Sequence, residues 1–175
     1  MGSDNLGKVA QLRQAAQEIH RKTYEIQVEV QDGGKMPFKA HATDAGFDLF
    51  ATEDISIAPG QVIRHPLNIR LGLPENCWAE ITSKSGLGAK GLLVYAGVID
   101  SGYTGVPHVV ATNLKLVEIA EDGTVTEAKP LNIKKGEKLA QLIMNPYSQN
   151  FYMVQVPTLD KTSDRGSGGF GSTGA

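Results

Sequence analysis

The C-terminal segment of the chain combines the residue types that bind phosphate groups. Five glycines lie within residues 166–174, and Arg165 precedes them. Glycine allows successive backbone N–H groups to point into one concavity that binds phosphate oxygens, and arginine adds a fork of donors. Phe170 is the one large apolar residue of this run and could cover a flat ring. A flexible linker or a purification remnant has a similar composition, but the embedded arginine and phenylalanine favour phosphate binding.

A second candidate segment ends an apolar run in a carboxylate. Residues 94–99 are mostly apolar, Asp100 follows them, and Gly102 and Gly105 lie on either side of Tyr103. An aspartate at the end of a strand could orient or deprotonate a water molecule. It could instead hydrogen-bond to its own turn, which is the commoner role of a turn aspartate. Tyr103 could form a stacking wall or belong to the core.

Three further segments carry isolated polar residues. Residues 82–87 place hydroxyl groups and a lysine before Gly86, a pattern that resembles a small anion cradle but lacks the spacing of a Walker motif. Asp48 interrupts an apolar run, so it either has a functional role or faces solvent. Gln141 lies inside another apolar run, where a buried amide needs a partner from the backbone or from a ligand.

The hydrophobic pattern predicts the elements that position these residues. Apolar residues spaced three and four apart predict an amphipathic helix over residues 4–22. From residue 24 the period changes to two, and short apolar runs separated by turn residues predict an all-β sandwich, jelly roll or barrel. The runs cover residues 24–30, 47–51, 55–57, 61–65, 69–73, 78–81, 92–99, 109–116, 139–144 and 152–156. Residues 86–91 could hold one short helix, and residues 121–124 are typical of a hairpin turn.

The composition restricts the class of protein. The 175 residues include 17 lysines and arginines against 19 aspartates and glutamates, so the net charge is −2. This balance lacks the basic excess of a nucleic-acid or anionic-membrane binder, and we expect neither partner. The single cysteine, Cys77, excludes an internal disulfide and a cysteine zinc site. No apolar run has the length of a membrane span and no signal peptide is recognisable, so we expect a cytoplasmic or nuclear protein, or a viral one acting in its host cell.

Taken together and in this order, five segments resemble the five motifs of the homotrimeric dUTP pyrophosphatase (dUTPase) family. The resemblance spans roughly residues 24–174, and the fifth segment is specific enough to decide it. The segments are AGFDL at 45–49, SKSGL at 83–87, GVIDSGYTG at 97–105, GEKLAQL at 136–142 and RGSGGFGSTG at 165–174.

The resemblance implies an enzyme that hydrolyses dUTP to dUMP and pyrophosphate with Mg²⁺, on a jelly-roll subunit of a threefold trimer. Such an enzyme limits uracil incorporation into DNA and supplies dUMP for dTMP synthesis. By the same resemblance, Asp100 activates the water that attacks the α-phosphorus, and Tyr103 lies beneath the deoxyribose and excludes a 2′-hydroxyl. Uracil would be read in the hairpin before the aspartate, by main-chain groups of Val94, Gly97, Val98 and Ile99.

Further roles on the phosphate side follow from the resemblance. Gln141 would donate to the phosphate chain, and Asp48 would hold a water on the Mg²⁺ rather than the ion itself. Ser85 would stabilise the oxygen of the breaking α–β bridge. The expected phosphate contacts of the second motif are Ser83, Lys84, Ser85 and Gly86. The tail would close over the nucleotide of another subunit as a lid, through Arg165, Gly169, Phe170, Gly171, Ser172 and Thr173.

We therefore expect three zones: a helical extension over residues 1–22, a dUTPase-like β domain over 23–160 and a flexible lid over 161–175. The chain departs from the family pattern in three places. Lys84 stands where the family has arginine, which replaces a bidentate fork by a point charge. Gly102 stands where a second acid is common. The connection at 114–129 is longer than the family's usual one.

Two other functions remain alternatives. A dCTP deaminase would share the fold, but Asp100 followed by Gly102 and Tyr103, with the complete glycine tail, favours the hydrolase. A nucleotide-gated regulatory protein, as some phage members of the family are thought to be, would bind a protein partner through residues 114–129. This second role is compatible with catalysis.

Overall fold

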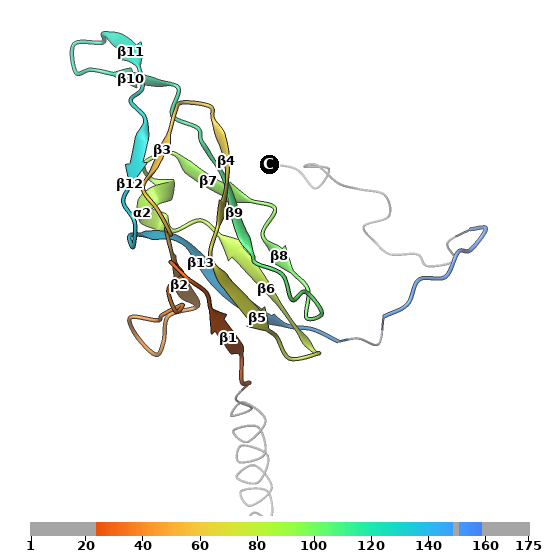
Figure 1. Ribbon diagram of the computed structural model, residues 1–175. Coiled ribbons are helices and arrows are strands. Elements are labelled where there is room, and N and C mark those ends of the chain that lie inside the picture. Colours follow the sequence, from red (N-terminus) through yellow and green to blue (C-terminus); the bar gives the residue numbers. More distant parts are fainter. Residues whose placement is uncertain (1–23, 149–150, 159–175) are drawn as a thin grey trace, which may run out of the picture.

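The computed structural model describes residues 24–148 and 151–158 (Figure 1). Strands dominate this part of the chain, as the sequence predicted, and the described residues contain one short helix, α2 (Ser85–Gly88). The strands are β1 (Gln27–Val30), β2 (Gly46–Phe50), β3 (Ile55–Ile57), β4 (Val62–Pro66), β5 (Ile69–Gly72), β6 (Cys77–Thr82), β7 (Leu92–Tyr95), β8 (Val98–Ile99), β9 (His108–Asn113), β10 (Val117–Ile119), β11 (Val125–Glu127), β12 (Leu131–Ile133) and β13 (Lys138–Pro146). The helix predicted at 4–22 and the lid predicted at 161–175 lie outside the described residues.

The strands form small antiparallel sheets around one core. The largest sheet has the order β2-β13-β6-β8, and a second has the order β4-β9-β7. The pairs β1-β5, β12-β3 and β10-β11 complete the described sheets. Alternation of side chains puts Ala79 and Ile81 of β6 into the same buried cluster as Val109 and Ala111 of β9. The two larger sheets therefore share their inner faces, and the core is continuous between them.

The predicted run at 92–99 is interrupted in the structure. It forms two strands, β7 and β8, because Ala96 between them adopts a positive φ of 55° and turns the chain. A non-glycine residue in this region of backbone space is uncommon and strained. The apolar pattern ran through the break because the residues from 92 to 99 are mostly apolar, and Gly97 was the one turn signal within the run.

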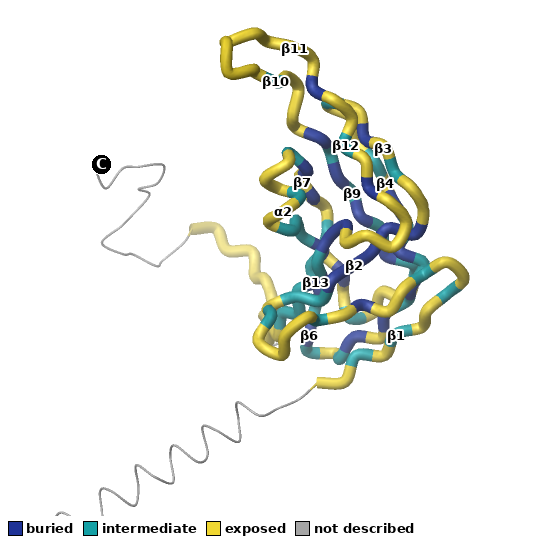
Figure 2. Tube along the Cα trace, turned by 90° about the vertical axis from the view of Figure 1, so that its left-hand side faces the viewer, coloured by how far each residue is buried: buried dark blue, intermediate teal, exposed yellow. Residues whose placement is uncertain are grey.

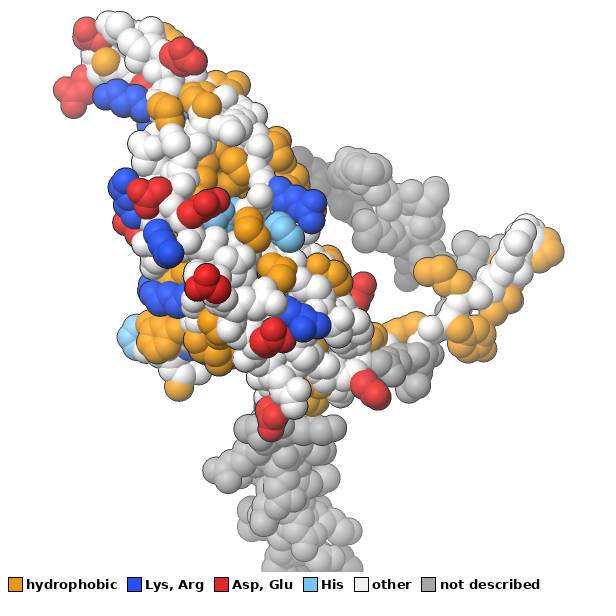
Figure 3. Space-filling view, in the orientation of Figure 1, with side chains coloured by type: hydrophobic (Ala, Val, Ile, Leu, Met, Phe, Trp, Pro, Cys, Tyr) orange, Lys and Arg blue, Asp and Glu red, His pale blue; other side chains and the backbone are white. Residues whose placement is uncertain are grey.

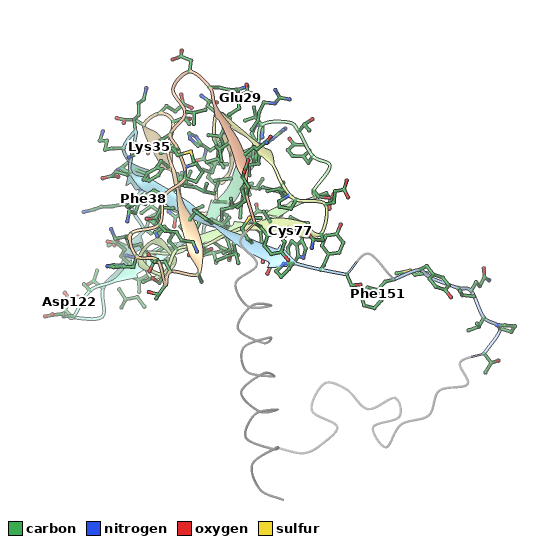
Figure 4. The ribbon with its side chains drawn as sticks, turned by 90° about the horizontal axis from the view of Figure 1, so that it is seen from below. Glu29, Lys35, Phe38, Cys77, Asp122 and Phe151 are labelled. Atoms are coloured by element: carbon green, nitrogen blue, oxygen red, sulfur yellow. The ribbon has the colours of Figure 1, made fainter. Side chains whose placement is uncertain are left out.

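Two segments project from the body of the molecule. The hairpin β10–β11 confirms the turn predicted at 121–124, and its residues are mostly exposed (Figure 2). The second segment is an arm at 151–158, where the strand predicted at 152–156 is wrong, because these residues are irregular and exposed. Figure 4 shows Asp122 on the hairpin and Phe151 on the arm, on opposite sides of the body. The missing partner strand explains the failed prediction: an apolar run forms a strand only where a neighbour satisfies its main-chain groups.

Candidate active site

Asp100 and Tyr103 border one pocket with a volume of about 200 Å³. The pocket lies where the hairpin β7–β8 and the loop after it meet strands β4, β6 and β9. The lining residues are Arg64, Ile81, Ala96, Gly97, Val98, Ile99, Asp100, Tyr103, Pro107, His108 and Val110. The structure therefore brings together five of the predicted site residues, at positions 97–100 and 103.

The hairpin that forms one wall of the pocket is pressed against β6. The N–H of Ile81 donates to the main-chain oxygen of Gly97 over 2.8 Å. A β-carbon at position 97 would collide with the main-chain oxygen of Ile81, so only glycine allows this approach. β8 is the edge strand of its sheet within the described residues, so its outer main-chain groups have no strand partner. An edge of this kind offers N–H and C=O groups to a flat polar ring.

The loop that carries Asp100 is shaped by its own hydrogen bonds. The N–H of Tyr103 donates to the main-chain oxygen of Asp100 over 3.0 Å, and the Tyr103 hydroxyl donates to the oxygen of Val106 over 3.1 Å. A β-carbon at Gly105 would lie 2.6 Å from the Tyr103 hydroxyl oxygen, so glycine is needed there for the ring to fold over the loop. Asp100 itself is exposed, and its carboxylate is accessible to a water molecule.

Asp48 is buried, with 6% of its surface exposed, so it does not face solvent as one reading of the sequence allowed. It lies in β2, and one carboxylate oxygen accepts from Lys84 while the other accepts from Lys138 over 2.7 Å. Burial would raise the pKa of Asp48, but the hydrogen bonds from Lys138 and Lys84 outweigh it and hold the pKa below its ordinary value. We call these three residues the Asp48 cluster.

Gln141 has a main-chain partner, one of the two possibilities that the sequence left open. Its Nε2 donates to the main-chain oxygen of Ser83 over 2.9 Å. The hydroxyl of the same serine accepts from the N–H of Val94 over 2.8 Å. Three predicted substrate contacts thus form one hydrogen-bonded unit that joins β13, β7 and the end of β6. Val94 is buried and does not line the pocket.

Ser85 and Gly86 begin α2 and are exposed. A β-carbon added at Gly86 would meet no atom within 4 Å, so the space above it is open. Neither packing nor backbone strain among the described residues requires glycine here, and the open space leaves room for a ligand. The lid residues from Arg165 to Thr173 lie outside the described part of the chain.

Sequence reasoning assigned no role to three basic residues near these groups. Arg64 and His108 line the pocket, and Lys138 pairs with Asp48. Lys138 lies in the fourth motif, three positions before Gln141, and its place in that motif could have marked it as a site residue. Arg64 carried none, because it reaches the pocket only through the pairing of β4 with β9, where it lies opposite Val110.

The described residues contain no group of three or more His, Cys, Asp or Glu side chains that could hold a metal ion. Fewer than three such side chains of the described residues could therefore contact one metal ion, and its other ligands would come from outside them, as when Mg²⁺ keeps waters or binds substrate phosphates. Within the same residues, no helix is long and apolar enough to cross a membrane.

Known proteins with similar sequences and folds point to one family. The dUTPase family profile matches residues 32–174. The Pol polyprotein of Ovine maedi visna related virus (strain South Africa) is 36% identical over 159 residues, and the deoxyuridine 5′-triphosphate nucleotidohydrolase of Clostridium tetani is 36% identical over 155 residues. These matches cover 91% and 86% of this chain. The solved dUTPase of Staphylococcus bacteriophage 80alpha with dUPNHPP has a TM-score of 0.75 at 29% identity, over 87% of this chain and 100% of that one.

The chain belongs to the dUTPase family, and the clostridial relative named above is a deoxyuridine 5′-triphosphate nucleotidohydrolase. This family defines the enzyme class as dUTP diphosphatase. The chain spans 13% of the length of the viral polyprotein and 97% of the length of the clostridial protein.

Proposed function

We propose that this protein hydrolyses dUTP to dUMP and pyrophosphate at the pocket beside Asp100. The observation that carries the proposal is the edge strand β8, whose residues line the pocket and which is followed by the exposed Asp100. Uracil presents an N–H and carbonyl groups in a fixed order, which a pair of main-chain groups can match. Cytosine has a different order and would be rejected by unpaired polar groups.

In this proposal, some residues of the pocket bind the base and the sugar, and others take part in the reaction. Main-chain groups of Gly97 and Val98 hold uracil, and the ring of Tyr103 forms the floor under the sugar, where a 2′-hydroxyl would collide. Asp100 accepts a proton from a water molecule as that water attacks the α-phosphorus. The bond from this phosphorus to the bridging oxygen breaks, and pyrophosphate leaves. Ser85 donates to the bridging oxygen as its charge develops.

Gln141 and Lys84 lie on the phosphate side of the reaction. The hydrogen bond from Gln141 to Ser83 uses one N–H of the amide, so the second can donate to a phosphate oxygen. Lys84 is paired with Asp48, which uses one N–H of its ammonium group and leaves other N–H donors for a phosphate, although the carboxylate holds the charge toward β2. This pairing makes Lys84 a weaker phosphate ligand than the arginine of the family motif.

The described residues fit a Mg²⁺ ion that is carried by the substrate rather than by a protein cage. Mg²⁺ keeps several waters and commonly binds one or two carboxylates together with substrate phosphates. Bound there, the ion neutralises phosphate charge. Asp48 would hold one of its waters, but both carboxylate oxygens already accept from lysines, so the water competes with Lys84 and Lys138.

The arm at 151–158 favours a homotrimer of jelly-roll subunits with shared active sites. Phe151, Tyr152 and Met153 are 86% to 103% exposed, and Figure 3 shows apolar side chains along the arm away from the body. So much apolar surface on an extended segment favours association with another copy of the chain. The lid at 161–175 follows this arm, so an arm docked on a neighbour would deliver the lid to that neighbour's nucleotide.

A second function is favoured by the shape of the hairpin β10–β11. Its register places Val117, Ile119 and Val125 on one face, and they are 49%, 71% and 60% exposed. The paired residues Glu118 and Thr126 lie on the opposite face. A two-stranded hairpin with an uncovered apolar face is marginal alone and suits a protein partner. The matched phage dUTPases are described as controlling transfer of virulence genes by a proto-oncogenic G protein-like mechanism, which supports a regulatory role here.

The decisive experiment is a pyrophosphate-release assay with dUTP, dCTP, dTTP and UTP, with and without Mg²⁺. We expect release from dUTP that depends on Mg²⁺ and little release from the other three nucleotides. Ammonia release from dCTP would replace the hydrolase by a dCTP deaminase. Equal rates with dUTP and UTP would contradict the role of Tyr103. Light scattering of the same preparation should give three subunits, and a monomer would contradict the shared sites.

A further inference from the structure

We propose that Arg70 is a positioning residue, which holds the loop of Asp100 and Tyr103 in its place beside the pocket. The proposal rests on dUTP hydrolysis at the pocket beside this loop. Arg70 lies on β5, and its Nε donates to the main-chain oxygen of Thr104 over 2.6 Å. Its Nη1 donates to Oε2 of Glu29, on β1, over 2.9 Å. One guanidinium group therefore joins the β1–β5 sheet to the middle of the loop.

The loop needs such an anchor because its own hydrogen bonds do not attach it to a sheet. The bonds from Tyr103 to Asp100 and Val106 run within the loop and give it its shape. The loop's end is attached where the N–H of Leu67 donates to Pro107. Among the hydrogen bonds of the described residues, the bond from Arg70 is the one that a side chain outside the loop makes to residues 100–107.

A groove of about 190 Å³ lies between the loop and the β1–β5 sheet. It is lined by Gln27, Glu29, Arg70, Leu71, Gly72 and Thr104. Both sides of the groove carry partners of the guanidinium group, so the Arg70 side chain spans it. Without this side chain, the loop would have no polar support on that side from the described residues.

The chemistry of the contact suits arginine in particular. Arg70 and Glu29 are directly opposite in the register of β1 and β5, so the carboxylate fixes the direction of the guanidinium plane. Figure 4 shows Glu29 on β1 at the edge of the molecule. The rigid fork then points a second N–H at Thr104, which the single charged nitrogen of lysine cannot do in the same geometry. A hydrogen bond from a charged donor is also stronger than a neutral one.

The same pair contributes little to overall stability. The side chains of Arg70 and Glu29 are 43% and 56% exposed, and ion pairs at this exposure are worth little. The effect of losing Arg70 is therefore local. Tyr103 precedes Thr104, so a loosened loop lets the tyrosine floor move away from the sugar, and discrimination against a 2′-hydroxyl falls with it.

The test compares R70M, R70K and E29Q with the unchanged chain. For each we measure kcat/KM for dUTP and for UTP, and amide hydrogen exchange of peptides covering residues 100–107. We expect R70M to lower the dUTP/UTP preference about tenfold, the worth of one hydrogen bond of about 1.4 kcal/mol, and to speed exchange in the loop. The dUTP/UTP preference and the loop exchange of R70K should lie between those of R70M and the unchanged chain. E29Q keeps the bond to Thr104 and should stay near the unchanged protein.

Unchanged loop exchange and unchanged preference in folded R70M would overturn the proposal. Peptides of β6 serve as the folding reference, since their exchange should not change. If R70M does not fold, R70K carries the same comparison, and no change in R70K would then overturn it. Failure of the unchanged chain to hydrolyse dUTP would defeat the proposed function instead, while the exchange measurement would still report on the anchor.

Discussion

The pocket beside Asp100 and the Asp48 cluster are built in opposite ways. The pocket is open, and one of its walls contains the edge strand β8 and Gly97, whose backbone packs closely on β6. The cluster is formed by charged side chains, and each oxygen of its buried carboxylate already has a lysine. In the proposed function, the surface for the base is thus present before substrate binds, whereas the charged groups for the phosphates are already hydrogen-bonded to Asp48. The difference predicts where substitutions affect chemistry and where they affect stability.

The largest expected effect is at the open pocket. Asp100→Asn keeps the size of the side chain but removes the proton acceptor, so dUTP binding should persist while kcat falls about 10²- to 10⁴-fold. Asp122→Asn, on the hairpin β10–β11, is the matched control and should leave turnover unchanged. Near-normal kcat in the Asp100 variant would refute its assignment as the base.

Removal of the lid is expected to have the next largest effect. Because the lysines of the Asp48 cluster are held by that carboxylate, the lid is the proposed source of further phosphate donors. Truncation after Lys161 should leave folding and subunit assembly intact and lower kcat/KM by about 10²-fold or more. Full activity of the truncated chain would mean that the tail is a spacer.

A methyl group at Gly97 tests whether the pocket depends on its close backbone approach. Gly97→Ala should push the hairpin off β6, lower the free energy of unfolding by about 1–3 kcal/mol and weaken dUTP binding. Gly86→Ala is the contrasting variant, because a β-carbon there meets no atom within 4 Å, and it should unfold like the unchanged protein. Equal stability of the two variants would argue against a backbone-built pocket.

The Asp48 cluster predicts a pH dependence of stability. Because the folded pKa of Asp48 is lowered, its stabilisation is present above the ordinary value of 3.8 and is lost as the pH falls through the folded pKa. Asp48→Asn should lower the free energy of unfolding by about 1–3 kcal/mol at neutral pH, and the deficit should shrink in acid. Urea titrations at several pH values measure this. A deficit that is constant with pH, or equal to that of the exposed Asp32→Asn, would contradict the ion-paired arrangement.

The smallest effect on catalysis is expected from the hairpin, which belongs to neither region. Deletion of residues 117–127 should leave dUTP hydrolysis unchanged. These residues line neither the pocket beside Asp100 nor the groove at Arg70. The deletion should abolish capture of a regulatory protein partner. Equal loss of hydrolysis and capture would show that the hairpin supports the enzyme itself.

Local sequence patterns were sufficient to predict many strands and turns of this molecule. Alternation predicted strands such as β6 and β9, and glycine and acidic residues predicted the β10–β11 turn. Side-chain period and turn chemistry depend on neighbours in sequence, so the amino-acid sequence alone determined them. The run at 152–156 failed for the complementary reason, since a strand also needs a partner that the sequence does not identify.

The pairing of distant residues was decided only by the tertiary structure. The sequence marked Asp48 and Gln141 as polar residues in apolar runs, but it did not indicate that Asp48 would meet two lysines. It likewise gave no sign that Arg70 would reach Thr104, because these residues are 34 positions apart. Hydrogen bonds and ion pairs form between groups that folding brings within about 3 Å, and that proximity depends on strand order and register rather than on local sequence.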